Sequence, residues 1–129
     1  MVKQKRQLFS KAEKNLPKLD FSLVPRESWQ RFLSKGIAEE IAQNSPIDDF
    51  TGKNWQLRLG NHTLEAPTST PKYAQEKGLT FAAPFKLMAT LINKKTGEAV
   101  EQEVFMGNIP QMTNRGTFVI NGIERAVIN

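Results

Sequence analysis

Two runs of β-branched and apolar residues near the end of the chain are separated by the dipeptide Asn121-Gly122. Asparagine followed by glycine tolerates the positive φ angles that a type I′ turn needs at both central positions, so this spacing predicts a tight β-hairpin. The two-residue loop also fixes the register, which pairs Ile120 with Ile123, Val119 with Glu124, and Phe118 with Arg125. One face of the hairpin should therefore carry Phe118, Ile120 and Ile123, with the Arg125 stem over the Phe118 ring.

Residues 26–44 show the period of an amphipathic helix. Its apolar stripe consists of Trp29, Phe32, Leu33, Ile37 and Ile41, and the place of Trp29 in this stripe favours core packing over stacking on a nucleic-acid base. Gly36 costs about 1 kcal/mol relative to alanine inside a helix, so the pattern also allows two shorter helices with a break near Gly36. Residues 20–25 are expected to form an extended approach segment, because Pro25 disfavours helical backbone at Val24.

A strand is expected over residues 55–64, with a bulge or bend at Gly60-Asn61. A short helix should follow, because Thr70 is a good N-cap, Pro71 suits the first helical turn, and Gly78 is a natural end.

The next segment, residues 79–93, alternates in the manner of a strand and carries apolar side chains on both faces, so we expect it to be central in a sheet. A hairpin loop at residues 94–97, with Gly97 in a left-handed conformation, should lead to a return strand over residues 99–106. The acids of that strand can face solvent or pair with Lys86 and Lys94 across the ladder.

These elements predict an α+β fold, with two short helical regions followed by an antiparallel β-hairpin meander. Residues 1–19 are expected to be a basic, loosely ordered tail, and residues 20–129 one domain. The outgoing strand of the last hairpin reaches Asn129 with no covering element after it. We therefore expect the domain to be incomplete and the chain to be part of something longer.

The net charge of +5 is concentrated in the tail. Residues 1–18 hold a single acid, Glu13, and six basic residues, namely Lys3, Lys5, Arg6, Lys11, Lys14 and Lys18. Such a tail can bind nucleic acid by counterion release, and it can equally be a solvated terminus. The chain has no cysteine, no apolar run of membrane-spanning length and no signal-peptide pattern, so a cytoplasmic location is the expectation.

No motif for catalysis or metal binding is found in the sequence. There is no Gly-rich phosphate loop, no Cys/His metal spacing and no nucleophile elbow. Asp48 and Asp49 are adjacent residues in an expected turn, and His62 has no second histidine or cysteine with which to build a site. We therefore expect no catalytic and no metal-ligating residue, and interpret the chain as a binding or structural module.

Several strings of this sequence closely resemble the N-terminal part of the beta subunit of bacterial DNA-directed RNA polymerase. They are residues 80–85 (TFAAPF), 94–97 (KKTG), 101–107 (EQEVFMG), Ile109-Pro110, Met112-Thr113, 116–122 (GTFVING) and Glu124-Arg125, preceded by 27–33 (ESWQRFL) and 46–52 (PIDDFTG). The resemblance covers roughly residues 20–129. One departure is Gln111, which stands where the family usually has an apolar residue.

The resemblance implies that this segment is the start of the protrusion, a wall beside the main DNA channel. The whole enzyme is a nucleotidyltransferase whose Mg ions are held mainly by the beta-prime subunit, so the chain alone should be inactive and bind no cofactor. Implied partners are the rest of beta, beta-prime, alpha and sigma, the DNA template and the RNA product. Val127, Ile128 and Asn129 would lie at the edge of the rifampicin pocket.

Candidate nucleic-acid contacts are Arg115 and Arg125 in the hairpin region, together with Lys3, Lys5 and Arg6 in the tail. An alternative interpretation is an independent β-rich nucleic-acid-binding module whose basic tail supplies the affinity. A free-standing hydrolase or transferase would need a group of catalytic side chains that the sequence does not offer.

Overall fold

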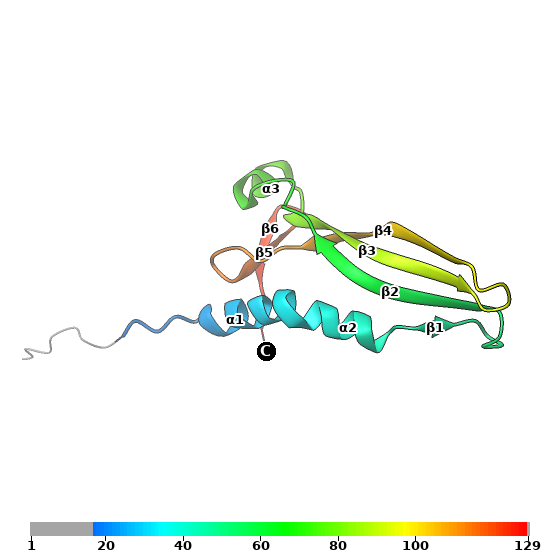
Figure 1. The fold of residues 1–129 in the computed structure, drawn as a ribbon. Coiled ribbons are helices and arrows are strands. Elements are labelled where there is room, and N and C mark those ends of the chain that lie inside the picture. The colour runs from blue at the N-terminus through cyan, green and yellow to red at the C-terminus, as the bar shows by residue number, and fades with distance from the viewer. Residues whose placement is uncertain (1–16, 129) are drawn as a thin grey trace, which may run out of the picture.

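The computed structural model describes residues 17–128 and confirms the α+β class (Figure 1). Its helical elements are α1 (Leu23–Arg31), the π-helical turn η1 (Phe32–Gly36), α2 (Ile37–Gln43) and α3 (Pro71–Lys77). Its strands are β1 (Ile47–Asp48), β2 (Trp55–Leu64), β3 (Ala82–Asn93), β4 (Ala99–Pro110), β5 (Thr117–Ile120) and β6 (Ile123–Ala126). Figure 1 shows α1, η1 and α2 as one helical rod lying along the sheet.

The rod begins at Leu23, so the prediction of an extended approach segment over residues 20–25 was wrong. The Asp20 carboxylate accepts hydrogen bonds from the backbone N–H of Ser22 (2.9 Å) and from its hydroxyl (2.6 Å), and it forms an ion pair with Arg26. These contacts hold the chain in place at the first turn. Pro25 lies within that turn, where a missing backbone N–H removes no hydrogen bond.

The predicted break near Gly36 is instead a π-helical turn, and the rod continues through it. A β-carbon on Gly36 would lie 3.0 Å from Cδ2 of Phe32, so glycine leaves room for the Phe32 ring. An α-helix turns about 100° per residue, which would place Trp29 and Ile41 about 120° apart around the axis. Because i→i+5 hydrogen bonds put more residues into each turn, the π turn reduces this angle and keeps the apolar stripe on one side.

Four strands form an antiparallel sheet in the order β1-β2-β3-β4, with β3 central as predicted. The predicted bulge in β2 is present, since Leu59 pairs with Ala89 and His62 pairs with Leu87. A second bulge follows Phe85, and β4 continues to Pro110, beyond the predicted end of this strand at residue 106. The two-residue strand β1 was not predicted, and the expected turn begins only after it.

The hairpin β5–β6 has the predicted register at all three pairs. Asn121 and Gly122 have φ angles of 51° and 79°, as a type I′ turn requires. Hydrogen bonds attach this hairpin to the chain before β3: Phe81 N–H donates to the Val119 carbonyl (3.0 Å) and Gly122 N–H to the Leu79 carbonyl (2.8 Å). The hairpin is therefore fixed beside the end of α3, which is capped by Thr70 and ended by left-handed Gly78 as predicted.

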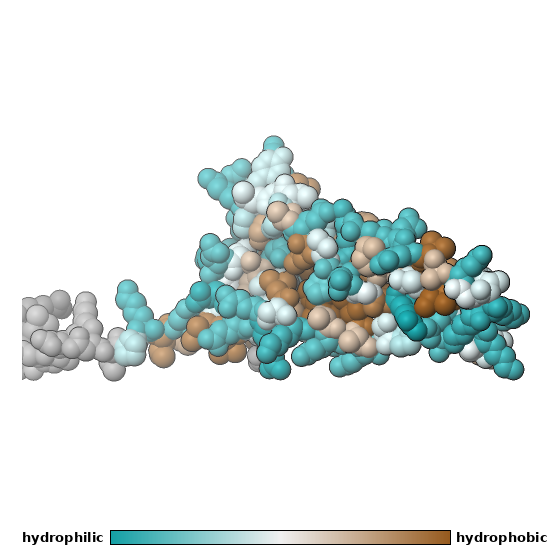
Figure 2. Space-filling view, in the orientation of Figure 1, coloured by the Kyte–Doolittle hydropathy of each residue, from teal (hydrophilic) through white to brown (hydrophobic). Residues whose placement is uncertain are grey.

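The apolar core of the described residues is small. Its buried members are Ile37, Ala74, Ala83, Leu87 and Val119. Many large apolar side chains remain exposed, and Figure 2 shows them at the start of the rod and between the rod and the sheet. None of the helices in residues 17–128 is both long enough and apolar enough to cross a membrane.

Candidate interaction site

Helix α1 contacts the β5–β6 hairpin through an aromatic pair. The rings of Trp29 and Phe118 lie edge to face, with centroids 5.4 Å apart and planes at 84°. Phe32 extends this cluster, its ring centroid lying 5.5 Å from that of Trp29. Edge-to-face geometry places the positive ring edge against the negative ring face, which favours this orientation. The prediction that Trp29 packs on the apolar stripe agrees with this contact.

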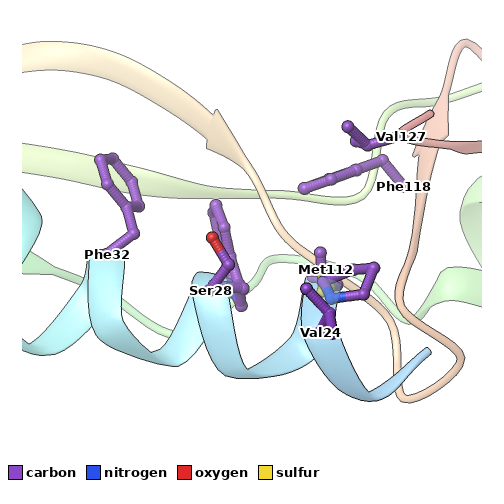
Figure 3. Close-up of a pocket in the computed structure, with 8 residues that line it drawn as sticks. Val24, Ser28, Phe32, Met112, Phe118 and Val127 are labelled. Carbon is purple, nitrogen blue, oxygen red and sulfur yellow. The ribbon is translucent and has the colours of Figure 1, made fainter. Parts of the chain in front are cut away.

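An apolar cavity of about 410 Å³ opens between α1 and the hairpin. Figure 3 shows Val24, Ser28 and Phe32 projecting from the rod toward Met112, Phe118 and Val127. A second cavity of about 390 Å³ adjoins it, because Trp29, Phe118 and Val127 line both. We call this continuous feature the α1–hairpin groove, defined by Val24, Trp29, Phe32, Met112, Phe118 and Val127.

The two candidate arginines of the hairpin region lie on opposite faces of it. Arg115 is 3.4 Å from the Glu124 carboxylate, and Glu124 and Arg125 are successive strand residues that point to opposite sides. Arg125 lines the second cavity of the groove. The structure therefore does not bring Arg115 and Arg125 together as one basic patch.

Of the other candidate residues, one lines the groove, one is exposed beside it in sequence, and the rest lie outside the described range. Val127 lines both cavities, and Ile128 is 90% exposed. Lys3, Lys5, Arg6 and Asn129 lie outside residues 17–128.

Glu124 is the centre of a polar cluster that sequence reasoning did not identify. Its carboxylate accepts hydrogen bonds from the Thr117 hydroxyl (2.6 Å) and from the side-chain amide of Gln75 (3.3 Å) in addition to the Arg115 contact. Gln75 belongs to α3, so this cluster joins the hairpin to a helix 49 residues earlier. Only the hairpin register, which places Glu124 opposite Val119, could have indicated which face it takes.

Asp48 and Asp49, the adjacent acids of the expected turn, both form contacts with neighbouring side chains. Asp48 lies 2.6 Å from Lys94 Nζ and also accepts a hydrogen bond from Gln56 (3.1 Å). The hydrogen bond from Lys94 is the main cause that holds the pKa of Asp48 below its usual range. The hydrogen bond from Thr51 is likewise the main cause that lowers the pKa of Asp49. Each carboxylate thus fixes the loop at this end of the sheet.

Lys86 lies between Glu65 (2.5 Å) and Glu103 (3.7 Å). The hydrogen bond to Glu65 is the main cause that raises the pKa of Lys86. The predicted pairing of Lys86 with an acid of the return strand is confirmed for Glu103, whereas Lys94 pairs with Asp48 of β1 instead.

Within the described part of the chain, no three His, Cys, Asp or Glu side chains come together in a way that could hold a metal ion. His62 is half-buried, and its ring centroid lies 5.9 Å from that of Phe85. Gln111 is almost fully buried, and its amide donates to the Ile109 carbonyl (2.9 Å), so its side chain supports the local backbone. The groove is therefore lined mainly by apolar side chains, with Arg125 lining its second cavity.

No protein-family model matches the chain. Among characterised proteins it is 44% identical over 106 residues to the DNA-directed RNA polymerase subunit beta of Geobacillus kaustophilus, covering 82% of the chain and 9% of that protein. It is 41% identical over 131 residues to that of Alkaliphilus oremlandii, with 98% and 10% covered, and 44% identical over 121 residues to that of Prochlorococcus marinus, with 93% and 11% covered. The chain thus spans about a tenth of the length of these relatives. It is homologous to a segment of the bacterial RNA polymerase beta subunit.

Proposed function

We propose that the chain functions as part of the beta subunit of a DNA-directed RNA polymerase, in DNA-templated transcription. The observation that carries this proposal is the identity of 41% to 44%, over 82% to 98% of the chain, with proteins of that name. In this proposal the chain works with the rest of beta, with beta-prime, alpha and sigma, and with DNA and RNA, in the cytoplasm. Mg ions are held mainly by beta-prime, and the chain alone has no catalytic activity.

The finer proposal is that the chain forms the start of the protrusion and a wall of the DNA channel. It is supported by the resemblance of the strings described above and by the extended sheet with the helical rod along it (Figure 1). Arg125 at the edge of the groove is the proposed phosphate contact on β6. Arg115 contributes less to phosphate binding in this proposal, because the nearby carboxylate of Glu124 offsets part of its charge.

A hybrid enzyme tests the main proposal. The 106 matched residues of the Geobacillus kaustophilus beta subunit are replaced by the aligned residues of this chain, and the other subunits of that polymerase are added. We expect assembly and promoter-dependent RNA synthesis, whereas the beta subunit without the segment is inactive. A hybrid that assembles no better than the deleted subunit would contradict the proposal.

Cross-linking gives a direct test of the proposed position beside the DNA. A photoreactive amino acid at position 125 of the hybrid should cross-link to template or non-template DNA. The matched control is the same amino acid at position 72, where Lys72 is exposed on α3. Cross-linking that is equal at both positions, or absent at 125, would contradict the placement of Arg125 at the DNA.

The proposed position of residues 127–129 at the edge of the rifampicin pocket can be tested through inhibition of RNA synthesis. Substitution of Val127, Ile128 or Asn129 in the hybrid should change the rifampicin concentration that halves RNA synthesis, and Val100→Ala on β4 should not.

The alternative function, an independent nucleic-acid-binding module, would be favoured by tight, salt-dependent DNA binding of the isolated chain that is lost on deletion of residues 1–18.

A further inference from the structure

We propose that Asn121 is a covalent modification site, at which deamidation occurs only when the tip of the β5–β6 hairpin opens. The site consists of the Asn121-Gly122 pair and of the contacts that hold this pair in the folded chain. Neither the chemistry nor these contacts depend on the proposed function.

An asparagine followed by glycine is prone to lose its side-chain amide as ammonia. Once hydroxide removes the proton of the Gly122 N–H, the nitrogen attacks Cγ of Asn121. A cyclic imide forms as the Cγ–Nδ2 bond breaks, and Nδ2 leaves as ammonia after it takes a proton from water. A second water molecule then opens the imide at either carbonyl and leaves aspartate or isoaspartate. Glycine favours the attack because it has no side chain to hinder it, and the sequence contains one such pair.

The proton that must be removed is held by a hydrogen bond in the folded chain. The Gly122 N–H donates to the Leu79 carbonyl at 2.8 Å. An amide proton in such a bond exchanges with solvent mainly after the bond opens locally. The nitrogen of Gly122 therefore becomes a nucleophile only when the hairpin tip separates from Leu79.

The backbone of the turn also keeps the two reacting atoms apart. Asn121 has a φ angle of 51°, and the first central residue of a type I′ turn has a ψ angle of about +30°, the mirror image of type I. For an L-residue, this ψ angle places Cβ of Asn121 and the nitrogen of Gly122 on nearly opposite sides of the Cα–C bond. The cyclic imide needs both on the same side, so the turn must rotate about this bond before the ring can close.

The surroundings of the turn resist that rotation, although the asparagine itself is open to solvent. The Thr80 hydroxyl accepts a hydrogen bond from the Asn121 N–H (3.1 Å), and Gly122 packs against the backbone of Gly78 at the end of α3. Asn121 is exposed, so water and hydroxide can reach it. The conformation of the tip, and not access of solvent to Asn121, therefore limits the reaction.

The two products differ in their effect on the hairpin. Aspartate followed by glycine still favours a type I′ turn, so this product keeps the register. Isoaspartate routes the backbone through Cβ and adds a backbone atom to the loop, which then no longer matches the turn that pairs Ile120 with Ile123. Formation of isoaspartate thus prevents an opened tip from returning to its contacts with Leu79 and Thr80.

A reference pair within the same chain makes the test quantitative. Thr68→Asn with Ser69→Gly adds a second asparagine–glycine pair before α3, where Thr68 is exposed and the Ser69 N–H forms no backbone hydrogen bond among residues 17–128. The complete chain with both substitutions is incubated in mildly alkaline buffer, with and without urea. Circular dichroism verifies the fold before incubation, and peptide mapping by mass spectrometry follows asparagine, aspartate and isoaspartate at both pairs.

We expect the folded chain to react at least about tenfold more slowly at Asn121 than at position 68, because only the open fraction of the tip can react. In urea the two rates should be similar, since neither pair is then held by other residues. Thr80→Val should raise the rate at Asn121 in the folded chain, because it removes the hydroxyl that binds the Asn121 N–H. The matched control is Thr96→Val, which removes a hydroxyl that accepts the Glu98 N–H (3.4 Å) in another hairpin loop and should leave this rate unchanged.

Three results would contradict the proposal. Equal rates at the two pairs in the folded chain would overturn it, because the turn would then give no protection. Absence of reaction at Asn121 in urea would overturn it as well, since Asn121 would not be a modification site. An isoaspartate form that unfolds at the same urea concentration as the unmodified chain would reject the effect on the hairpin. These results leave the proposed function intact, because the hybrid enzyme tests that function separately.

Discussion

A β-carbon on Gly122 would lie 2.7 Å from the Cα atom of Gly78. The tip of the β5–β6 hairpin therefore touches the end of α3 so closely that only glycine fits. Both residues also have positive φ angles, 79° and 68°. The turn that defines the hairpin and the turn that ends the helix thus form one contact between segments 44 residues apart in sequence.

Gly122→Ala should destabilise the fold by at least about 2 kcal/mol, because it adds backbone strain and a backbone clash. The control is Gly97→Ala, where φ is 76° but no atom lies within 4 Å of the added carbon. That variant should lower the free energy of unfolding only by the backbone strain, about 1 kcal/mol. Urea unfolding of both variants measures the difference, and equal losses would mean that the contact with Gly78 can relax freely.

The Trp29–Phe118 pair should show a coupling free energy of about 0.5–1.5 kcal/mol in a double-mutant cycle with leucine at each position. Trp55 provides a control ring, since it is the first residue of β2 and pairs with Asn93 at the end of β3. The cycle of Trp55→Leu with Phe118→Leu should give a coupling near zero. Similar values in the two cycles would show that the edge-to-face geometry adds nothing beyond buried area.

Asp48 should make the stability of the fold sensitive to acid. Because the hydrogen bond from Lys94 lowers its pKa in the folded state, the stabilisation is complete above the ordinary aspartate pKa of about 4 and is lost as the pH falls through the folded value. Asp48→Asn should therefore lower the urea midpoint at pH 7, and the gap to wild type should close below about pH 4.

Glu101→Gln is a suitable control for this pH experiment, because it also removes one negative charge from the sheet. Glu101 lies on β4 opposite Thr90 and forms no ion pair with another residue in the described range. A pH-dependent gap of the same size for Glu101→Gln would assign the effect to net charge instead of the Asp48–Lys94 contact.

Thr70→Ala should destabilise α3 by about 1 kcal/mol, because its hydroxyl accepts a hydrogen bond from Tyr73 N–H (3.2 Å) at the N-cap. Serine at the same position should restore most of the loss. Thr68→Ala in the preceding loop should change the unfolding midpoint little. An unaffected midpoint in Thr70→Ala would show that docking of the hairpin, and not the cap, stabilises this short helix.

Features fixed by local chemistry were predictable from the sequence. Asn121-Gly122 specifies a turn and hence a register, and Thr70, Pro71 and Gly78 bound a helix, because each acts on backbone within a few residues. The bulge at Gly60-Asn61 belongs to the same group. These predictions needed no knowledge of distant contacts.

The features that were missed depend on contacts that a local pattern does not contain. The early start of α1 follows from the contacts of Asp20 with Ser22 and Arg26, which outweigh the usual effect of Pro25 on the residue before it. Strand β1 exists because it pairs with β2 and because Lys94 contacts Asp48. The groove joins Trp29 to Phe118, residues too far apart in sequence for periodicity to relate them.

The π-helical turn has a consequence for how the length of the rod can vary. With Phe32–Gly36 in π geometry, the rod holds one residue more than a regular α-helix would need to align Trp29 with Ile41. Removing one residue there would leave eleven steps of about 100°, close to three whole turns, so a plain α-helix would still present both side chains on the same side. Adding one would turn Ile41 away from the side of the rod that carries Trp29. The rod can therefore lose a residue at this point without losing its alignment, but it cannot gain one.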